Sequence, residues 1–117
     1  MDIYKKIMVA VDISHEADIV LGKAINLSEK YNSEVVLVHV VVENSYNLAP
    51  VIDTQLEENL VGRAENFLKE LASKYNINQN STHVFVGSIK AEIHKFAIDN
   101  GIELIILGTH IPVAIEI

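Results

Sequence analysis

The residues best suited to bind a ligand stand at the ends of apolar runs in the sequence. Asp12 follows the run 7–11, and Gly108, Thr109 and His110 end or follow the last run of this kind before the final segment. Continuous apolar runs are typical of strands that are buried on both faces of a parallel sheet. Ligands of such sheets bind outside the carboxyl ends of the strands, where the strand order reverses. We therefore expect these residues to share one ligand-binding rim.

Asp12 is the strongest candidate on this rim, because its place beside the expected reversal point favours a ligand contact over a helix cap or a loop acid. His39 interrupts the apolar run 35–42, which favours a buried, hydrogen-bonded histidine over a catalytic one. His15 and His110 could approach one another near the rim. Without a third ligand at a fixed spacing they do not predict a metal site.

Gly87 and Ser88 precede an expected helix and leave two interpretations open. The start of that helix could bind an anion, or the pair could be a turn followed by an N-cap. Lys90 could reach a phosphate from the first turn, although a single lysine on a rim is usually solvated. No nucleophile beside a base can be recognised. We therefore expect no dedicated enzyme activity.

Composition limits the classes of protein that this chain can represent. The 117 residues are 50% hydrophobic, which suits one domain, 1–117, with a real core. A net charge of -7 without any basic run argues against nucleic-acid binding. The chain has no cysteine, so disulfides and thiolate sites are excluded. The apolar run near the amino terminus is too short for a signal peptide or a membrane span, and we expect a cytoplasmic protein.

Strand patterns and helix patterns alternate four times along the chain. The first helix is expected over about 15–31 with Ser14 as its N-cap, and the second is expected to open at the capping box Thr54–Glu57. Ser88 is expected to cap the third helix, which Asn100-Gly101 would end. Such alternation predicts a parallel α/β sheet with right-handed crossovers.

Four segments, taken in order, carry a resemblance to a known family: YKKIMVAVDIS, VVLVHVV, VGSIKAEIHKFAIDNGIELIILGTH and IPVAIEI. Together they resemble the universal stress protein family over essentially the whole chain. The resemblance implies a doubly wound five-stranded parallel sheet of order 3-2-1-4-5, of the adenine nucleotide alpha hydrolase-like class. It also implies a role in stress adaptation and a homodimer formed through the last strand, here Val113 to Ile117.

Many members of this family bind ATP, and the resemblance implies a role for three positions of this chain. Asp12 matches an acidic residue beside the ribose and adenine, and Val40 matches a position whose backbone contacts the adenine. Gly108 matches the first glycine of a phosphate motif that continues with two residues, Gly, nine residues, Gly and then Ser or Thr. Ile111 stands at the second glycine and the third has no counterpart. An adenine nucleotide is thus implied, with Mg²⁺ only beside it, while the departure argues against a bound triphosphate.

The segment GTHIPV is too short to join two parallel strands of one sheet, since such a crossover needs about a dozen residues or more. The last strand could fold back as an antiparallel hairpin, the chain could carry a deletion, or the sequence could omit a loop and helix. We favour the third explanation, because IPVAIEI resembles the final strand of the family.

Three functions therefore remain in view, namely a nucleotide-binding stress protein, a nucleotide-independent dimeric module that contacts another protein, and a slow ATP hydrolase. In the final segment Val113, Ile115 and Ile117 alternate with Ala114 and Glu116. This alternation predicts an edge strand with an apolar row that is suited to pairing.

Overall fold

The structure is a computed structural model that describes residues 3–42, 54–108 and 113–117. Its centre is one five-stranded sheet of order β3-β2-β1-β4-β5, in which the first four strands are parallel. The strands are β1 (Lys6–Val11), β2 (Glu34–Val42), β3 (Thr82–Gly87), β4 (Leu104–Gly108) and β5 (Val113–Glu116). The strand order and the mostly parallel α/β class expected from the sequence are confirmed.

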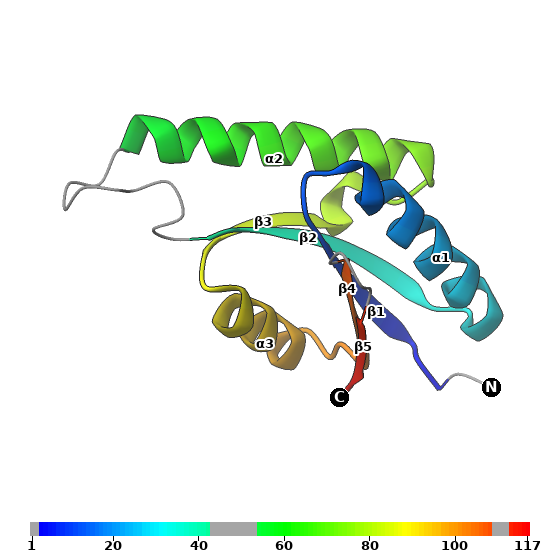
Figure 1. Cartoon of the computed structure of the whole chain (residues 1–117). Helices are drawn as coiled ribbons and strands as arrows, with labels where there is room; N and C mark the ends of the chain where they lie inside the picture. The colour runs from blue at the N-terminus through cyan, green and yellow to red at the C-terminus, as the bar shows by residue number, and fades with distance from the viewer. Residues whose placement is uncertain (1–2, 43–53, 109–112) are drawn as a thin grey trace.

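Helices cover both faces of this sheet (Figure 1). They are α1 (His15–Tyr31), α2 (Thr54–Lys74) and α3 (Ile89–Asp99), with a short 3₁₀ turn η1 (Gln79–Ser81) before β3. Figure 1 shows α1 and α2 on one face and α3 on the other. Right-handed crossovers produce this division, because the chain moves from β1 outward to β3 and then returns across the sheet to β4. The reversal of direction lies between β1 and β4.

From Ile7 to Val11 the central strand β1 is apolar, because successive side chains enter two different cores. Ile7, Val9 and Val11 belong to the core under α1 and α2. Met8 and Ala10 belong to the core under α3. A strand that is buried on both faces has no position for a polar side chain, which is why the sequence shows no alternation there.

The ends of α3 follow the predicted signals, and the start of α1 follows them in part. Ser88 caps α3, since its hydroxyl accepts a hydrogen bond from the backbone N–H of Ala91 at 3.1 Å. Asn100 and Gly101 follow the end of α3, and Gly101 adopts a φ of 65°, which glycine tolerates best. Ser14 precedes α1 as predicted, but its side chain makes no capping hydrogen bond.

The direction of β5 corrects the expectation of a fifth parallel strand. β5 pairs antiparallel with β4, with Leu107 opposite Val113 and Leu104 opposite Glu116. The reason is the length of the connection, since a few residues can join antiparallel strands but not parallel ones. The hairpin that we ranked below a missing crossover is therefore the arrangement that this chain adopts. The connecting residues 109–112 lie outside the described ranges.

Helix α2 reaches further than the sheet that it covers. Its 21 residues make it the longest element described, and Figure 1 shows its first turns projecting past the strands. Its buried apolar residues begin only at Ala64 and continue with Leu68, Leu71 and Ala72. Its second half therefore supplies most of the packing. None of the helices in the described ranges is long and apolar enough to cross a membrane.

Candidate functional site

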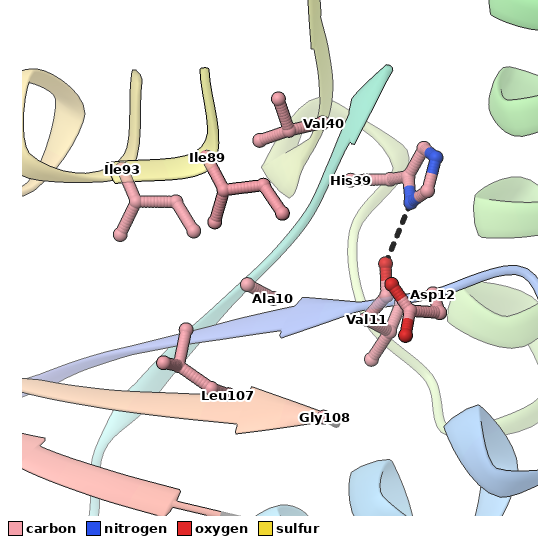
Figure 2. Close-up of a pocket in the computed structure, with 9 residues that line it drawn as sticks. All are labelled: Ala10, Val11, Asp12, His39, Val40, Ile89, Ile93, Leu107 and Gly108. Carbon is pink, nitrogen blue, oxygen red and sulfur yellow. Dashed lines mark hydrogen bonds between the residues drawn. The ribbon is translucent and has the colours of Figure 1, made fainter. Parts of the chain in front are cut away.

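A pocket lies where the carboxyl ends of β1, β2 and β4 meet the start of α3 (Figure 2). Its volume is about 60 Å³, and it is partly open to solvent. Its lining consists of Ala10, Val11, Asp12, His39, Val40, Ile89, Ile93, Leu107 and Gly108. This is the reversal point of the sheet, where doubly wound folds bind their ligands.

The structure brings together three of the predicted site residues, Asp12, Val40 and Gly108. Asp12 directly follows β1 and is exposed, so its carboxylate is available to a ligand. Val40 is buried in β2. The other two predicted site residues, Thr109 and His110, lie outside the described residues.

Gly108 allows β4 to approach the end of β1 closely. A Cβ at this position would lie 3.1 Å from the backbone oxygen of Ala10 and 3.2 Å from a side-chain carbon of Val11. A backbone atom cannot easily move aside, so a larger residue would push the two strand ends apart. The packing of β4 against β1 explains this glycine without any phosphate contact.

His39 holds the polar side of the pocket in place. Its Nδ1 lies 2.6 Å from the carbonyl oxygen of Val11. A carbonyl oxygen can only accept, so Nδ1 carries a proton and donates it to this oxygen. The hydrogen-bonded histidine predicted from the sequence is confirmed, although it is half-buried at the pocket and not fully buried in the core.

The opposite side of the pocket is an apolar wall. Figure 2 shows Asp12 and His39 on one side and Val40, Ile89 and Ile93 across from them. Sequence reasoning assigned no site role to Ile89, Ile93 or Leu107, because apolar side chains carry no reactive group. One signal was available, since Ile89 directly follows the N-cap Ser88 and is 46% exposed although it is strongly apolar.

The other candidates from the sequence lie elsewhere. Gly87 and Ser88 do not line the pocket, and the Ser88 hydroxyl is occupied as the cap of α3, which supports the turn-and-cap interpretation. Lys90 lines a different hollow between α3 and β5. His15 lines a polar hollow between α1 and α2. In the described parts of the chain, no three His, Asp or Glu side chains are grouped so that they could hold a metal ion.

The side chains with perturbed ionisation lie outside the pocket. Hydrogen bonds from Lys74 and Tyr75 lower the pKa of Asp18, and they join α1 to the end of α2. Burial, with a smaller effect of Lys6, lowers the pKa of His83. These groups therefore belong to the packing of the fold, and the pocket itself contains one carboxylate and one imidazole.

A larger apolar groove lies between α3 and β5. Its volume is about 540 Å³. Its lining comprises Ile89, Lys90, Ile93, His94, Ile98, Ile105, Leu107, Ile115, Glu116 and Ile117. Ile89 and Leu107 also line the site pocket, so the two hollows are neighbours.

The pocket suits a flat ring with polar edges better than it suits catalysis. The apolar wall can cover one face of a ring, while Asp12 and the main chain at the strand ends can accept or donate hydrogen bonds at its edge. The described lining contains no hydroxyl, thiol or amine that could act as a nucleophile.

Comparison with known proteins gives a consistent result. A family model described as the Universal stress protein family matches residues 3–112. A protein of Staphylococcus haemolyticus that is named as a universal stress protein is 33% identical over 110 residues, which are 91% of this chain and 67% of that protein. The chain spans about two thirds of the length of the curated relatives that it matches.

Solved structures share the fold. A universal stress protein family member from Burkholderia pseudomallei superposes with a TM-score of 0.72 at 20% identity, covering 94% of this chain and 85% of that one. A universal stress protein in complex with cAMP has a TM-score of 0.57 at 13% identity, covering 88% of this chain and 75% of that one. At these identities the likeness concerns the fold alone.

Proposed function

Because the chain belongs to the universal stress protein family, we propose that it is a non-enzymatic, cytoplasmic stress-response protein whose pocket binds an adenine nucleotide or nucleoside. The observation that carries this proposal is the pocket at the reversal point of the sheet, where Asp12 faces the apolar wall of Val40, Ile89 and Ile93. The fold is shared with a universal stress protein that was solved with cAMP. An adenine ring and a ribose match the chemistry of this lining.

Each side of the pocket has a role in this proposal. The purine ring lies against Ile89 and Ile93, which shield one of its faces from water. The main chain at Val40 hydrogen-bonds the edge of the purine. Asp12 accepts hydrogen bonds from the ribose hydroxyls. His39 fixes the carbonyl of Val11 and so the position of the residue that follows.

Thermal melting with and without adenine ligands tests the proposal. A ligand that binds only the folded protein stabilises it by roughly 2.7 kcal/mol at a hundredfold excess over Kd. We expect an upward shift of Tm that is reduced in Asp12→Ala. Asp99→Asn is a matched control, because Asp99 is an exposed acid at the far end of α3 and does not line the pocket. The absence of a shift with adenosine, AMP, cAMP, ADP and ATP would refute the proposal.

A second candidate function, a homodimeric interaction module, is favoured by β5. Every residue from Val113 to Ile117 is exposed, and Ile115 and Ile117 are 43% and 57% exposed beside the apolar groove. An open strand edge with an apolar row can pair with the same edge of a second copy. We propose a dimer formed through Val113 to Ile117.

Light scattering at micromolar concentration tests this dimer. We expect twice the monomer mass for the unmodified chain and the monomer mass for Ile115→Asp. Ile19→Asp should stay dimeric, because Ile19 is also an exposed isoleucine, at 60%, but lies on α1 away from β5. A monomeric unmodified chain would contradict the dimer and leave the ligand proposal untouched.

A further inference from the structure

We propose that this pocket selects against phosphate, so that adenosine binds more tightly than AMP, ADP or ATP. The inference rests on the proposed function and names the ligand class of the same site. It follows from three observations on the charge and the backbone around the pocket.

The first observation is the charge of the lining. Among the described lining residues, Asp12 is the one acid and none is a lysine or arginine, and Asp12 is exposed. A phosphate near Asp12 therefore meets a charge of its own sign. The overall charge of -7 adds to this repulsion.

The second observation is where the cations of this chain stand. All nine Lys and Arg residues lie in described elements or beside them, and none lines the pocket. They are Lys5, Lys6, Lys23, Lys30, Arg63, Lys69, Lys74, Lys90 and Lys95. Lys90 is the one on the first turn of α3, but it lines the α3–β5 groove. Lys74 is paired with Asp18.

The residues that the structure does not describe add no lysine or arginine either. By sequence, residues 1–2, 43–53 and 109–112 contain no lysine or arginine, whereas Asp2, Glu43 and Asp53 are acids. None of the nine Lys and Arg side chains of this sequence therefore lies where it could compensate the charges of a phosphate in this pocket.

The third observation concerns backbone N–H donors. Anion sites in such folds use the free N–H groups at a helix start. The helix that starts at this pocket is α3, and Ser88 already occupies the N–H of Ala91 at 3.1 Å while the apolar Ile89 stands in the first turn. After Gly108 the next described element is the strand β5, where a phosphate-binding helix would be needed.

Isothermal titration with adenosine, AMP, ADP and ATP, with and without Mg²⁺, tests the inference. At low salt we expect affinity to fall with each added phosphate, and ATP to bind at least about tenfold more weakly than adenosine. About 0.5 M salt should narrow this ratio, because it screens the repulsion. Asp12→Asn should also narrow the ratio while weakening adenosine, whereas the control Asp99→Asn should leave it unchanged.

The outcomes separate this inference from the proposed function. ATP binding as tightly as adenosine or more tightly would overturn the selection against phosphate and leave the adenine site standing. A ratio that responds neither to salt nor to Asp12→Asn would also overturn it, because the repulsion would then have another origin. If none of the four ligands bound, the proposed function itself would fail.

Discussion

At the scale of single residues, the hydrogen bond from His39 to the Val11 carbonyl connects β2 to the last residue of β1. Asp12 is the next residue, so the same bond restricts the backbone that presents the candidate ligand carboxylate. This hydrogen bond explains why a histidine stands in an otherwise apolar stretch of β2. The ring donates a hydrogen bond to the Val11 carbonyl at the end of β1 and so fixes the backbone at the rim of the pocket.

Replacing His39 with leucine tests how much this hydrogen bond contributes to the stability of the fold and to ligand binding. We expect His39→Leu to lower the free energy of unfolding by about 1 kcal/mol, because the carbonyl loses its partner. Adenosine affinity should fall as well. His39→Asn should retain part of the stability and part of the adenosine affinity, because the asparagine Nδ2 can donate to the Val11 carbonyl from about the place of Nδ1. Urea denaturation and titration measure the two effects, and equal losses in both variants would contradict this role.

His83 should make the fold sensitive to mild acid. Its ring stacks on Phe85 with centroids 6.1 Å apart and contacts Phe96 at 5.0 Å. Burial holds its pKa below the ordinary 6.5, so the neutral form is favoured when folded. The stabilisation is complete above 6.5 and is lost as pH falls through the lowered pKa, since the unfolded chain binds the proton more readily.

The measurement is unfolding free energy against pH between 7.5 and 5. We expect a decline in the unmodified chain that becomes shallower in His83→Phe, which cannot titrate and keeps the aromatic packing. His94→Gln serves as the control, because His94 is exposed on α3 and should not change the slope. A decline of equal steepness in His83→Phe would assign the acid sensitivity to other groups.

At the scale of elements, α2 combines two halves of different character. Its end is tied to α1, because Lys74 and Tyr75 both hydrogen-bond Asp18. Its beginning projects past the sheet and has no buried residue before Ala64 among the side chains described. The same substitution, leucine to alanine, can therefore be made in α2 once at a buried position and once at a position outside the core.

Leu60→Ala and Leu68→Ala form such a pair. Leu68 is 1% exposed in the core, and its truncation should destabilise the fold by about 3 kcal/mol through lost burial and a cavity. Leu60 lies in the projecting half, and its truncation should cost less than about 1 kcal/mol. Chemical denaturation of both variants checks this, and similar losses would mean that the first half of α2 is packed.

The sequence predicts elements well where the pattern is local. The strands β1, β2 and β4 are recognisable as apolar runs, which only His39 interrupts within β2, because both faces of these strands are largely buried. The direction of β5 is not a property of its own residues, since Val113 to Glu116 alternate in the same way in either direction. The length of GTHIPV did carry that information, and the family resemblance outweighed it.

The candidate site was only partly predictable for a similar reason. Asp12 could be placed at the rim, because the carboxyl ends of parallel strands meet at one end of the sheet. Val40 was assigned to the site through the family resemblance. The bond from His39 to the Val11 carbonyl depends on a side-chain rotamer, and the wall of Ile89 and Ile93 depends on how α3 lies across the sheet. Neither is encoded in a spacing that a reader could recognise.

At the scale of the whole molecule, the antiparallel β5 returns the chain to the end of the sheet at which β1 begins. The backbone N–H of Ile117 donates to the backbone carbonyl oxygen of Glu103 at 3.1 Å. The hydroxyl of Tyr4 donates to the carboxylate of Glu116. The backbone N–H of Lys5 donates to the Glu103 carboxylate at 2.7 Å. The first and last described residues therefore lie close together, at the end of the sheet opposite the pocket.

Neighbouring ends make the chain suitable for circular permutation. A short glycine-serine linker can join Ile117 to the amino terminus, and a new opening between Gln79 and Asn80 falls at exposed residues before β3. We expect the permuted chain to unfold cooperatively and to respond to adenosine as the original order does. Non-cooperative melting would show that β5 needs the original chain order to find its place beside β4.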